Sequence, residues 1–250
     1  MKQKLRIVIT AGPTREYLDP VRFLSNPSTG KMGFAIASAA ARRGHDVTLI
    51  AGPVVQKTPK GVKRIDVVSA REMLDAVVEV LSDATGVSRP RCRSFRGRGT
   101  LASPEQKTVF ISTAAVADWR PAECAASKLK KHQMSGTLKL VRNPDILKTI
   151  HTTFQTSQTL QTSQTLRLVG FAAETDNVLA EASRKCREKG LSFIVANDVT
   201  EKGSGFGTDT NRVTFVYPDG TFRRHPLMTK RRVAGAILAE ITANTENAVL

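Results

Sequence analysis

Cysteine and histidine are scarce in this sequence, and their spacing excludes several classes of site. The chain of 250 residues has three cysteines and four histidines. None forms a Cys-x-x-Cys pair or a His-Glu-x-x-His segment, and there is no nucleophile elbow, so a disulfide framework, a zinc site and a hydrolase triad lack support. The odd number of dispersed cysteines fits a reducing compartment.

Long apolar runs and aromatic side chains are also few. No stretch approaches the roughly eighteen consecutive apolar residues of a transmembrane helix. The N-terminus leads directly into a strand, without the apolar segment and cleavage site of a secretory signal. We therefore expect a soluble, cytoplasmic protein without a membrane partner. Aromatic residues make up 5% of the chain, which argues against base-stacking platforms for RNA.

Positive charge, in contrast, is in large excess, with a formal net charge of +16. This balance is typical of nucleic-acid binding, but it suits a cleft for small polyanionic substrates equally well. Part of the excess lies in residues 82–107, where six cationic residues accompany two acidic ones. This Arg-rich region and a QTSQTL repeat within residues 155–166 are expected to be mobile surface insertions without a catalytic role.

The hydrophobic pattern predicts an α/β fold in a single domain spanning residues 1–250, because 40% hydrophobic content can bury a sizeable core. Strands are expected at 5–12, 45–53, 62–68, 107–115, 166–174 and 191–198, with helices at 30–44, 69–83 and 176–190. Ser69 and Glu72 are typical of a capping box. The alternation indicates a Rossmann-like, mostly parallel sheet with helices on both faces. A hairpin at 211–226 and a helix at 227–242 follow.

A long irregular segment separates the first strand from the first helix. Turns at Gly12-Pro13, Asn26-Pro27 and Gly30 allow backbone amides to face a ligand, and the positive end of the helix that begins near Lys31 points to the same place. The segment is a candidate anion site. It is neither Gly-x-Gly-x-x-Gly nor a P-loop, which argues against an NAD(P)-binding reductase. Composition alone leaves open that the loop merely caps the sheet.

Six motifs in order resemble those of phosphopantothenoylcysteine synthetase, the phosphopantothenate-cysteine ligase of coenzyme A synthesis. They are ITAGPTREYLDPVRFLSNPSTGKMGFAIA, AAVADWRP, KLKK, NPDIL, VGFAAET and IVANDV. The resemblance is to the bacterial type, usually the C-terminal half of a bifunctional protein whose other half is a flavin-dependent decarboxylase. It allows for a separate decarboxylase chain as a partner.

The resemblance implies a two-step ligase reaction. The carboxylate of 4'-phosphopantothenate attacks CTP to give an acyl-cytidylate and pyrophosphate, and the amine of L-cysteine then displaces CMP. The bacterial type favours CTP over ATP, with Mg²⁺ assisting. The family also implies a homodimer in which a flap that carries the KLKK run covers the active site, often across the dimer interface.

The resemblance also implies roles for individual residues. Asn26 is expected to donate its amide to the carboxyl oxygen of phosphopantothenate and of the acyl intermediate. Lys128 is expected to neutralise charge on the nucleotide phosphates. These two are the expected catalytic residues, and Asp118 is the expected contact to the metal. The expected nucleotide-binding residues are Gly12, Ser28, Gly30, Ala114, Ala115, Asp118, Asn143, Pro144, Asp145, Ile146, Phe171, Lys185 and Lys189.

Several of these residues have structural alternatives that the sequence leaves open. Asn143 can serve only as the N-cap of the helix that follows it, Asp118 as a turn residue and Phe171 as a core side chain. Lys131, the last residue of the KLKK run, is expected to be solvated. The alternative function is nucleic-acid binding on a degenerate α/β scaffold, against which the intact motif residue Asn26 argues.

Overall fold

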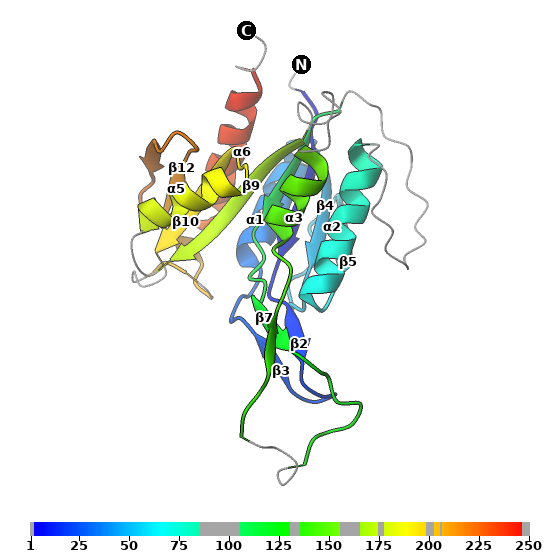
Figure 1. Cartoon of the computed structure of the whole chain (residues 1–250). Coiled ribbons are helices and arrows are strands. Elements are labelled where there is room, and N and C mark those ends of the chain that lie inside the picture. The colour runs from blue at the N-terminus through cyan, green and yellow to red at the C-terminus, as the bar shows by residue number, and fades with distance from the viewer. Residues whose placement is uncertain are drawn as a thin grey trace.

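The computed structural model, which describes residues 3–85, 106–130, 136–155, 166–174, 178–198, 203–205 and 207–246, is built on one central β-sheet. Eight described strands form it in the order β13-β12-β10-β9-β6-β1-β4-β5 (Figure 1). Strands β5 to β10 in this order are parallel, and β12 and β13 add an antiparallel hairpin. The strands are β1 (Arg6–Ala11), β4 (Asp46–Ala51), β5 (Val62–Asp66), β6 (Thr108–Ser112), β9 (Leu166–Glu174), β10 (Phe193–Asp198), β12 (Val213–Val216) and β13 (Phe222–Arg224). The predicted α/β fold is confirmed.

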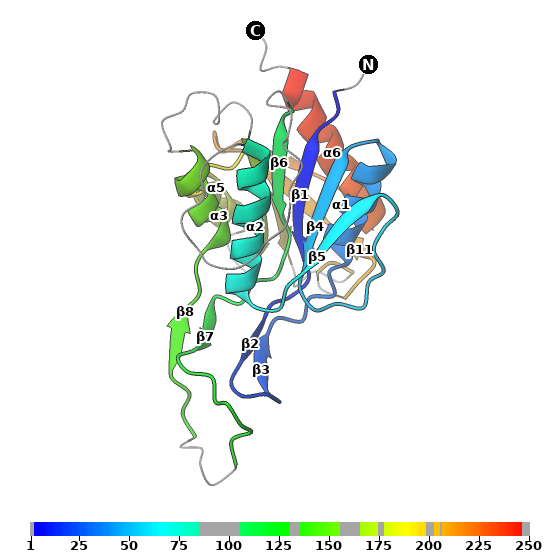
Figure 2. The same ribbon diagram turned by 90° about the vertical axis from the view of Figure 1, so that its right-hand side faces the viewer.

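Helices cover both faces of the sheet, which explains why its central strands are continuous apolar runs. Along β1, Ile7 and Ile9 pack into the core on one face while Val8 packs into the core on the other. The first core lies under α1 (Lys31–Arg42) and α6 (Lys230–Glu246), and the second under α2 (Ala70–Thr85), α3 (Ile146–Ile150) and α5 (Val178–Glu188) (Figure 2). A short π-helix, η2 (His151–Gln155), continues α3.

Two short ribbons project from the end of the molecule where β1 and β6 finish (Figures 1 and 2). One pairs β2 (Arg15–Tyr17) with β3 (Phe23–Ser25), and the other pairs β7 (Trp119–Pro121) with β8 (Leu140–Arg142). A third small pair joins β11 (Thr210–Asn211) to β14 (Met228–Thr229). None of these pairs was predicted, because strands of two or three residues are too short to show an alternation of apolar and polar residues.

Some local predictions need correction at their boundaries. Helix α2 continues to Thr85 with Ser82 buried, so the first four residues of the predicted 82–107 insertion are helical. The end of the second predicted insertion, Leu166, is the first residue of β9. Gln155, the first residue of that insertion, is the last residue of a short π-helix, and residues 106 and 107 of the first insertion are also described. The remaining residues of the two insertions, 86–105 and 156–165, lie outside the described residues, as does Lys131.

The predicted capping box at the start of α2 forms only in part. The Ser69 hydroxyl accepts the backbone N–H of Glu72 at 3.2 Å, but the Glu72 carboxylate accepts the N–H of Val68 and not that of Ser69. Among the helices described for this chain, none is long and apolar enough to span a bilayer.

Candidate active site

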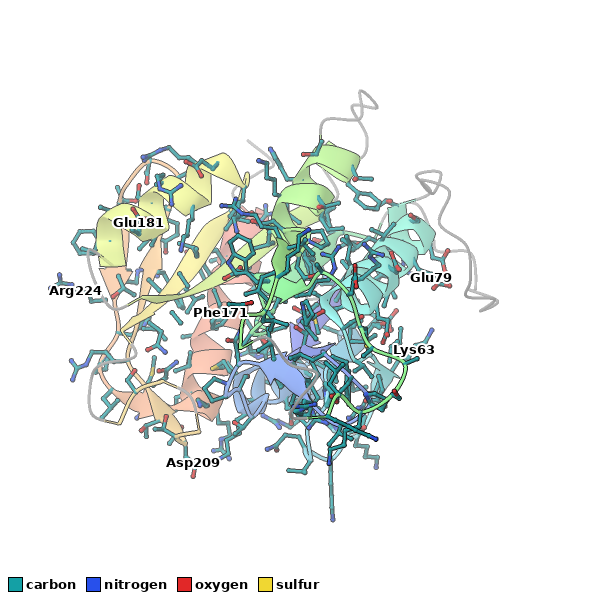
Figure 3. All side chains as sticks on the ribbon, turned by 60° about the horizontal axis from the view of Figure 1, so that its bottom comes forward. Lys63, Glu79, Phe171, Glu181, Asp209 and Arg224 are labelled. Carbon is teal, nitrogen blue, oxygen red and sulfur yellow. The ribbon has the colours of Figure 1, made fainter. Side chains whose placement is uncertain are left out.

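A cleft of about 470 Å³ opens at the carboxyl edge of the parallel strands, where ligands bind in open α/β sheets. Strand β6 contributes Ser112, β9 contributes Phe171, and β10 contributes Asn197. Figure 3 shows Phe171 near the centre of the molecule. All of the expected site residues line this cleft except Gly12 and Lys128.

The N-terminus of α1 forms one wall of the cleft. Its N-cap is Gly30, with φ of +75°, and neither a side-chain cap nor an acidic residue occupies the first turn. The first N–H groups of this helix are therefore available to an anion, at the positive end of the helix dipole. Gly12 stands behind this wall: a Cβ on Gly30 would lie 3.4 Å from the Gly12 nitrogen, and the Gly12 carbonyl accepts the N–H of Ala115 at 2.9 Å.

Asn26 connects this wall to the loop that follows β6. Its Nδ2 donates to the carbonyls of Ala115 and Val116, each at 3.2 Å. Both amide hydrogens are thus engaged by the protein. Since both neighbours are carbonyl oxygens, the orientation of the amide is determined, and its Oδ1 is the atom without a hydrogen-bond partner in the described part of the chain.

The loop at residues 113–118 is held by hydrogen bonds of hydroxyl groups that connect it to the first strand and to the segment after that strand. Thr14 Oγ1 accepts the N–H of Ala117 at 3.0 Å, and Thr113 Oγ1 donates to the carbonyl of Thr10 at 2.6 Å. The alanine side chains leave the loop backbone open to a ligand. At its end, the exposed carboxylate of Asp118 has no hydrogen-bond or ion-pair partner among the described residues.

Asn143 secures this loop from the opposite ribbon. Its Nδ2 donates to the carbonyl of Ala117 at 2.8 Å, its Oδ1 accepts from Arg120 at 3.2 Å, and its N–H donates to the carbonyl of Asp118 at 2.8 Å. The alternative that Asn143 caps α3 is wrong. Asp145 is the N-cap, and its Oδ1 accepts the N–H of Lys148 at 3.0 Å.

Cations and one aromatic ring complete the side of the cleft next to α5. Lys189 Nζ lies 2.7 Å from Asp145 Oδ2. Burial alone would raise the pKa of Asp145, but the hydrogen bond from Lys189 and the N–H of Lys148 outweigh it and hold that pKa below its usual value. Lys185 lines the same side. The half-buried ring of Phe171 packs against the core and also lines the cleft, so the two interpretations of this residue are compatible.

Two cleft lysines were missed by sequence reasoning. Lys31 Nζ, in the first turn of α1, lies 2.7 Å from the Asp209 carboxylate, which Figure 3 shows near the edge of the molecule. Lys230, only 8% exposed, donates to the carbonyls of Gly205 and Thr208 at 3.1 and 2.6 Å. Burial and then the charge of Lys31 lower the pKa of Lys230. Lys31 stands inside the quoted first motif, whereas nothing near Lys230 in the sequence identifies it.

Buried amides at the ends of β10 and β11 were missed as well. The Ser204 hydroxyl lies 2.6 Å from Asn197 Oδ1 and 2.7 Å from Asn211 Oδ1, and Asn211 also accepts the N–H of Gly205. This network ties Ser204 and Gly205 to the ends of β10 and β11. Asn197 belongs to the IVANDV motif, so a polar residue at the carboxyl end of a buried strand was the available signal.

Lys128 is not brought to the cleft of its own chain. It is exposed, in the segment that follows β7 on the projecting ribbon. Its absence from the lining of the cleft is the main difference between the expected site and the described one.

The residues present fit a metal ion that arrives with a nucleotide. No group of three His, Cys, Asp or Glu side chains suited to holding a metal occurs among the described residues. Of the two carboxylates that line the cleft, Asp145 pairs with Lys189, whereas Asp118 has no partner among the described residues. Mg²⁺ in nucleotide enzymes is commonly held by one or two carboxylates together with substrate phosphates, and the Asp118 carboxylate suits that arrangement.

Comparison with known proteins gives consistent relatives. The chain is 44% identical over 240 residues to the coenzyme A biosynthesis bifunctional protein CoaBC of Escherichia coli K12, and 42% identical over 238 residues to CoaBC of Bacillus subtilis. Each alignment covers 95% of this chain and 51% of the relative. The chain therefore spans about half the length of these curated relatives.

Solved structures give the same result. The C-terminal domain of CoaBC superposes with a TM-score of 0.72 at 37% identity, covering 98% of both chains. A Cab2 mutant in complex with phosphopantothenate-cysteine shares the fold, with a TM-score of 0.68 at 14% identity, over 98% of this chain and 88% of that one. The family model of the DNA/pantothenate metabolism flavoprotein C-terminal domain matches residues 2–88 and 98–245. The chain belongs to this family.

Proposed function

We propose that this chain, acting as one ligase unit over residues 1–250, joins 4'-phosphopantothenate to L-cysteine while CTP is converted to CMP and pyrophosphate. The observation that carries the proposal is the composition of the cleft. Three separate segments of the chain contribute to it: the uncapped N-terminus of α1, the loop with the free carboxylate of Asp118, and the segment with Lys185 and Lys189. The CoaBC relatives, named for coenzyme A biosynthesis, support the same reaction.

In the first step, a carboxylate oxygen of phosphopantothenate attacks the α-phosphorus of CTP and pyrophosphate leaves. The reactants are all anions, so the protein must neutralise charge and hold them in line. The amides of α1 and the lysines of the cleft bind phosphate oxygens, and Phe171 stacks on the base. Mg²⁺, held by Asp118 and the triphosphate, supplies further charge neutralisation when bound.

In the second step, the amine of cysteine attacks the acyl carbon and CMP leaves with the bridging oxygen, while the amine loses a proton to solvent. Charge develops on the acyl oxygen, and Asn26 Nδ2 is the donor proposed to stabilise it. Because Nδ2 already donates to Ala115 and Val116, one of these 3.2 Å bonds has to be exchanged for the substrate. Asn26 therefore couples the acyl group to the loop beside the nucleotide.

We also propose that the protein is a homodimer in which Lys128 serves the cleft of the second copy. Lys128 does not line the cleft of its own chain. The ribbons that carry it also expose large apolar side chains, namely Val21, Phe23, Trp119, Leu138 and Leu140. Several exposed apolar side chains on the two ribbons favour association with another chain.

The ligase proposal is tested by incubating the chain with 4'-phosphopantothenate, L-cysteine, Mg²⁺ and CTP, and measuring pyrophosphate and the product mass. Product should form, and omitting cysteine should leave the acyl-cytidylate. The control is Asp66→Asn, which removes a surface carboxylate outside the cleft. If pyrophosphate is not released under any of these conditions, the proposed function is wrong.

The dimer proposal has a separate test that uses complementation. A Lys128→Gln chain and an Asn26→Asp chain are each assayed alone and then after mixing and exchange of subunits. If Lys128 acts in the second copy, the mixed dimers contain one intact site and recover activity. Activity that stays at the level of the single variants in proven mixed dimers contradicts the arrangement.

The lining of the cleft does not support the alternative function, nucleic-acid binding. Among the described residues, Phe171 is the aromatic residue in its lining. A single ring is too little for the successive stacking that single-stranded nucleic acid uses.

A further inference from the structure

A fully buried carboxylate lies in the turn between β2 and β3, on a ribbon that projects from the domain. Asp19 is 0% exposed. Its Oδ1 accepts the N–H groups of Val21 and Arg22 at 2.9 and 2.8 Å, and its Oδ2 accepts Nε and Nη2 of Arg22 at 3.0 and 2.6 Å. The paired geometry of a guanidinium and a carboxylate fixes both side chains in one orientation.

The same pair holds a second, distant segment of the chain. Asp19 Oδ2 accepts the N–H of Leu129 at 3.2 Å, and Arg22 Nη2 donates to the carbonyl of Leu129 at 2.7 Å. A third bond, from the N–H of Ala125 to the carbonyl of Leu18 at 2.9 Å, lies nearby. We use the name arm for residues 122–130, which follow β7. The arm is thus attached along the β2–β3 turn at two points.

The electrostatics of Asp19 agree with a strong attachment. Burial alone would raise its pKa, but the hydrogen bonds from Arg22, Val21 and Leu129 outweigh burial and hold the pKa of Asp19 far below its usual value. A turn between two short strands can close without a buried charge. What the ion pair adds is a connection to both backbone polar groups of Leu129, the residue next to Lys128.

We propose that Asp19 and Arg22 are a positioning pair that sets the place of Lys128 by clamping Leu129. The inference rests on the proposed function of Lys128. A flexible lysine stem can correct only small errors of its backbone, and a displacement of about an ångström in a catalytic group can cost on the order of a hundredfold in rate. The clamp removes this freedom at the residue that follows the lysine.

The first test concerns the clamp itself and does not depend on ligase activity. Asp19→Asn should expose the arm, so that trypsin cuts after Lys128 or Lys130 about tenfold faster than in the parent protein, because local opening governs cleavage. Asp66→Asn is the matched control, since it removes an Arg–Asp contact of 2.7 Å on the surface of β5. Unchanged cleavage after these lysines in Asp19→Asn overturns the clamp.

The second test is a double-mutant cycle with Lys128→Gln. If Asp19 acts through Lys128, Asp19→Asn lowers kcat about tenfold in the parent and adds nothing in the Lys128→Gln background. If Asp19 has only a structural role, Asp19→Asn lowers kcat by the same factor in the parent protein and in the Lys128→Gln variant. Equal factors therefore overturn the positioning role. If Lys128→Gln itself has full activity, the proposed role of Lys128 fails, whereas the proteolysis result still decides whether the clamp exists.

A second variant covers the case in which Asp19→Asn does not fold. Leu129→Pro deletes one N–H donor and leaves the Asp19 and Arg22 side chains in place. It should increase cleavage after Lys130, the site to be followed here because trypsin does not cut a bond between lysine and proline, and it should lower kcat in the same sense as Asp19→Asn. Ala126→Pro, at an exposed position of the same arm, is the control for the proline ring. Equal effects of the two prolines contradict the clamp at Leu129.

Discussion

Replacing Asn26 by aspartate should separate the two chemical steps of the proposed reaction. The substitution keeps the shape of the side chain but turns its donor edge into a carboxylate. In the first step the acyl oxygen is part of an attacking carboxylate, and the side chains of Asp118, Asn143 and Phe171, proposed to contact the nucleotide, are unchanged. In the second step the carboxylate stands beside the oxygen on which negative charge develops, so this step should fail.

The structure gives two magnitudes for this change. Two hydrogen bonds of 3.2 Å, to Ala115 and Val116, are lost. Each is worth about 0.5–1.5 kcal/mol, so unfolding should become easier by about 1–3 kcal/mol, at the lower end because Asn26 is exposed. Losing an oxyanion donor costs about 2.7–4 kcal/mol, or roughly a hundredfold to a thousandfold in rate. The catalytic effect should therefore exceed the structural one.

The assay is a quenched reaction analysed by mass spectrometry for the acyl-cytidylate. The intermediate should accumulate in Asn26→Asp while pyrophosphate is still released. Asn26→Ala is the control, because it removes the same two bonds without adding charge and should accumulate less intermediate. Turnover of Asn26→Asp at the parent rate, or loss of pyrophosphate release with no intermediate, would refute the role given to Asn26.

Four further predictions follow from the same structure. Lys128→Gln should suppress formation of the intermediate itself, so pyrophosphate release without cysteine should fall about a hundredfold or more; a normal burst contradicts this. Gly33→Ala should destabilise the protein by about 1–3 kcal/mol in urea unfolding, because its Cβ would meet Ala11 Cβ at 2.5 Å and Thr113 Oγ1 at 2.6 Å; unchanged stability would mean that α1 does not pack closely on β1. The native pKa of Asp19 lies below its ordinary value of 3.8, so the unfolded state binds the extra proton and stability is lost as pH falls below about 5; Asp19→Asn should lose less over this range, and parallel curves would contradict the lowered pKa. Deleting residues 86–100 should leave ligase activity largely intact, and a folded but inactive deletion variant would place that segment in the site.

The central fold could be predicted because its strands are buried on both faces. Such strands are continuous apolar runs, as at Ile7, Val8 and Ile9. The helices between them show the hydrophobic period of an amphipathic helix in the sequence. The projecting ribbons could not be predicted. Their strands have only three residues each, too few for a hydrophobic alternation that could be read from the sequence.

The motifs predicted a set of residues that line one cleft, apart from Gly12 and Lys128, and the structure adds how these residues are held. Asn143 illustrates the limit: the sequence left open that it only caps a helix, whereas the cap is Asp145 and Asn143 binds the loop at Ala117. Lys230 illustrates a second limit. It reaches the cleft from the start of α6, and its acceptors are backbone carbonyls, which no side-chain pattern in the sequence can reveal.

The central claim is that the reaction proceeds through an acyl-cytidylate. It is tested most directly by following the carboxylate oxygens of 4'-phosphopantothenate into the products. With 4'-phosphopantothenate labelled by ¹⁸O in its carboxylate, the proposed attack on the α-phosphorus makes one labelled oxygen the bridge of the acyl-cytidylate. Release of CMP in the second step then carries that oxygen away. Mass spectrometry should find one ¹⁸O in CMP and none in pyrophosphate. Unlabelled CMP, or label in pyrophosphate or inorganic phosphate, would contradict an acyl-cytidylate ligase.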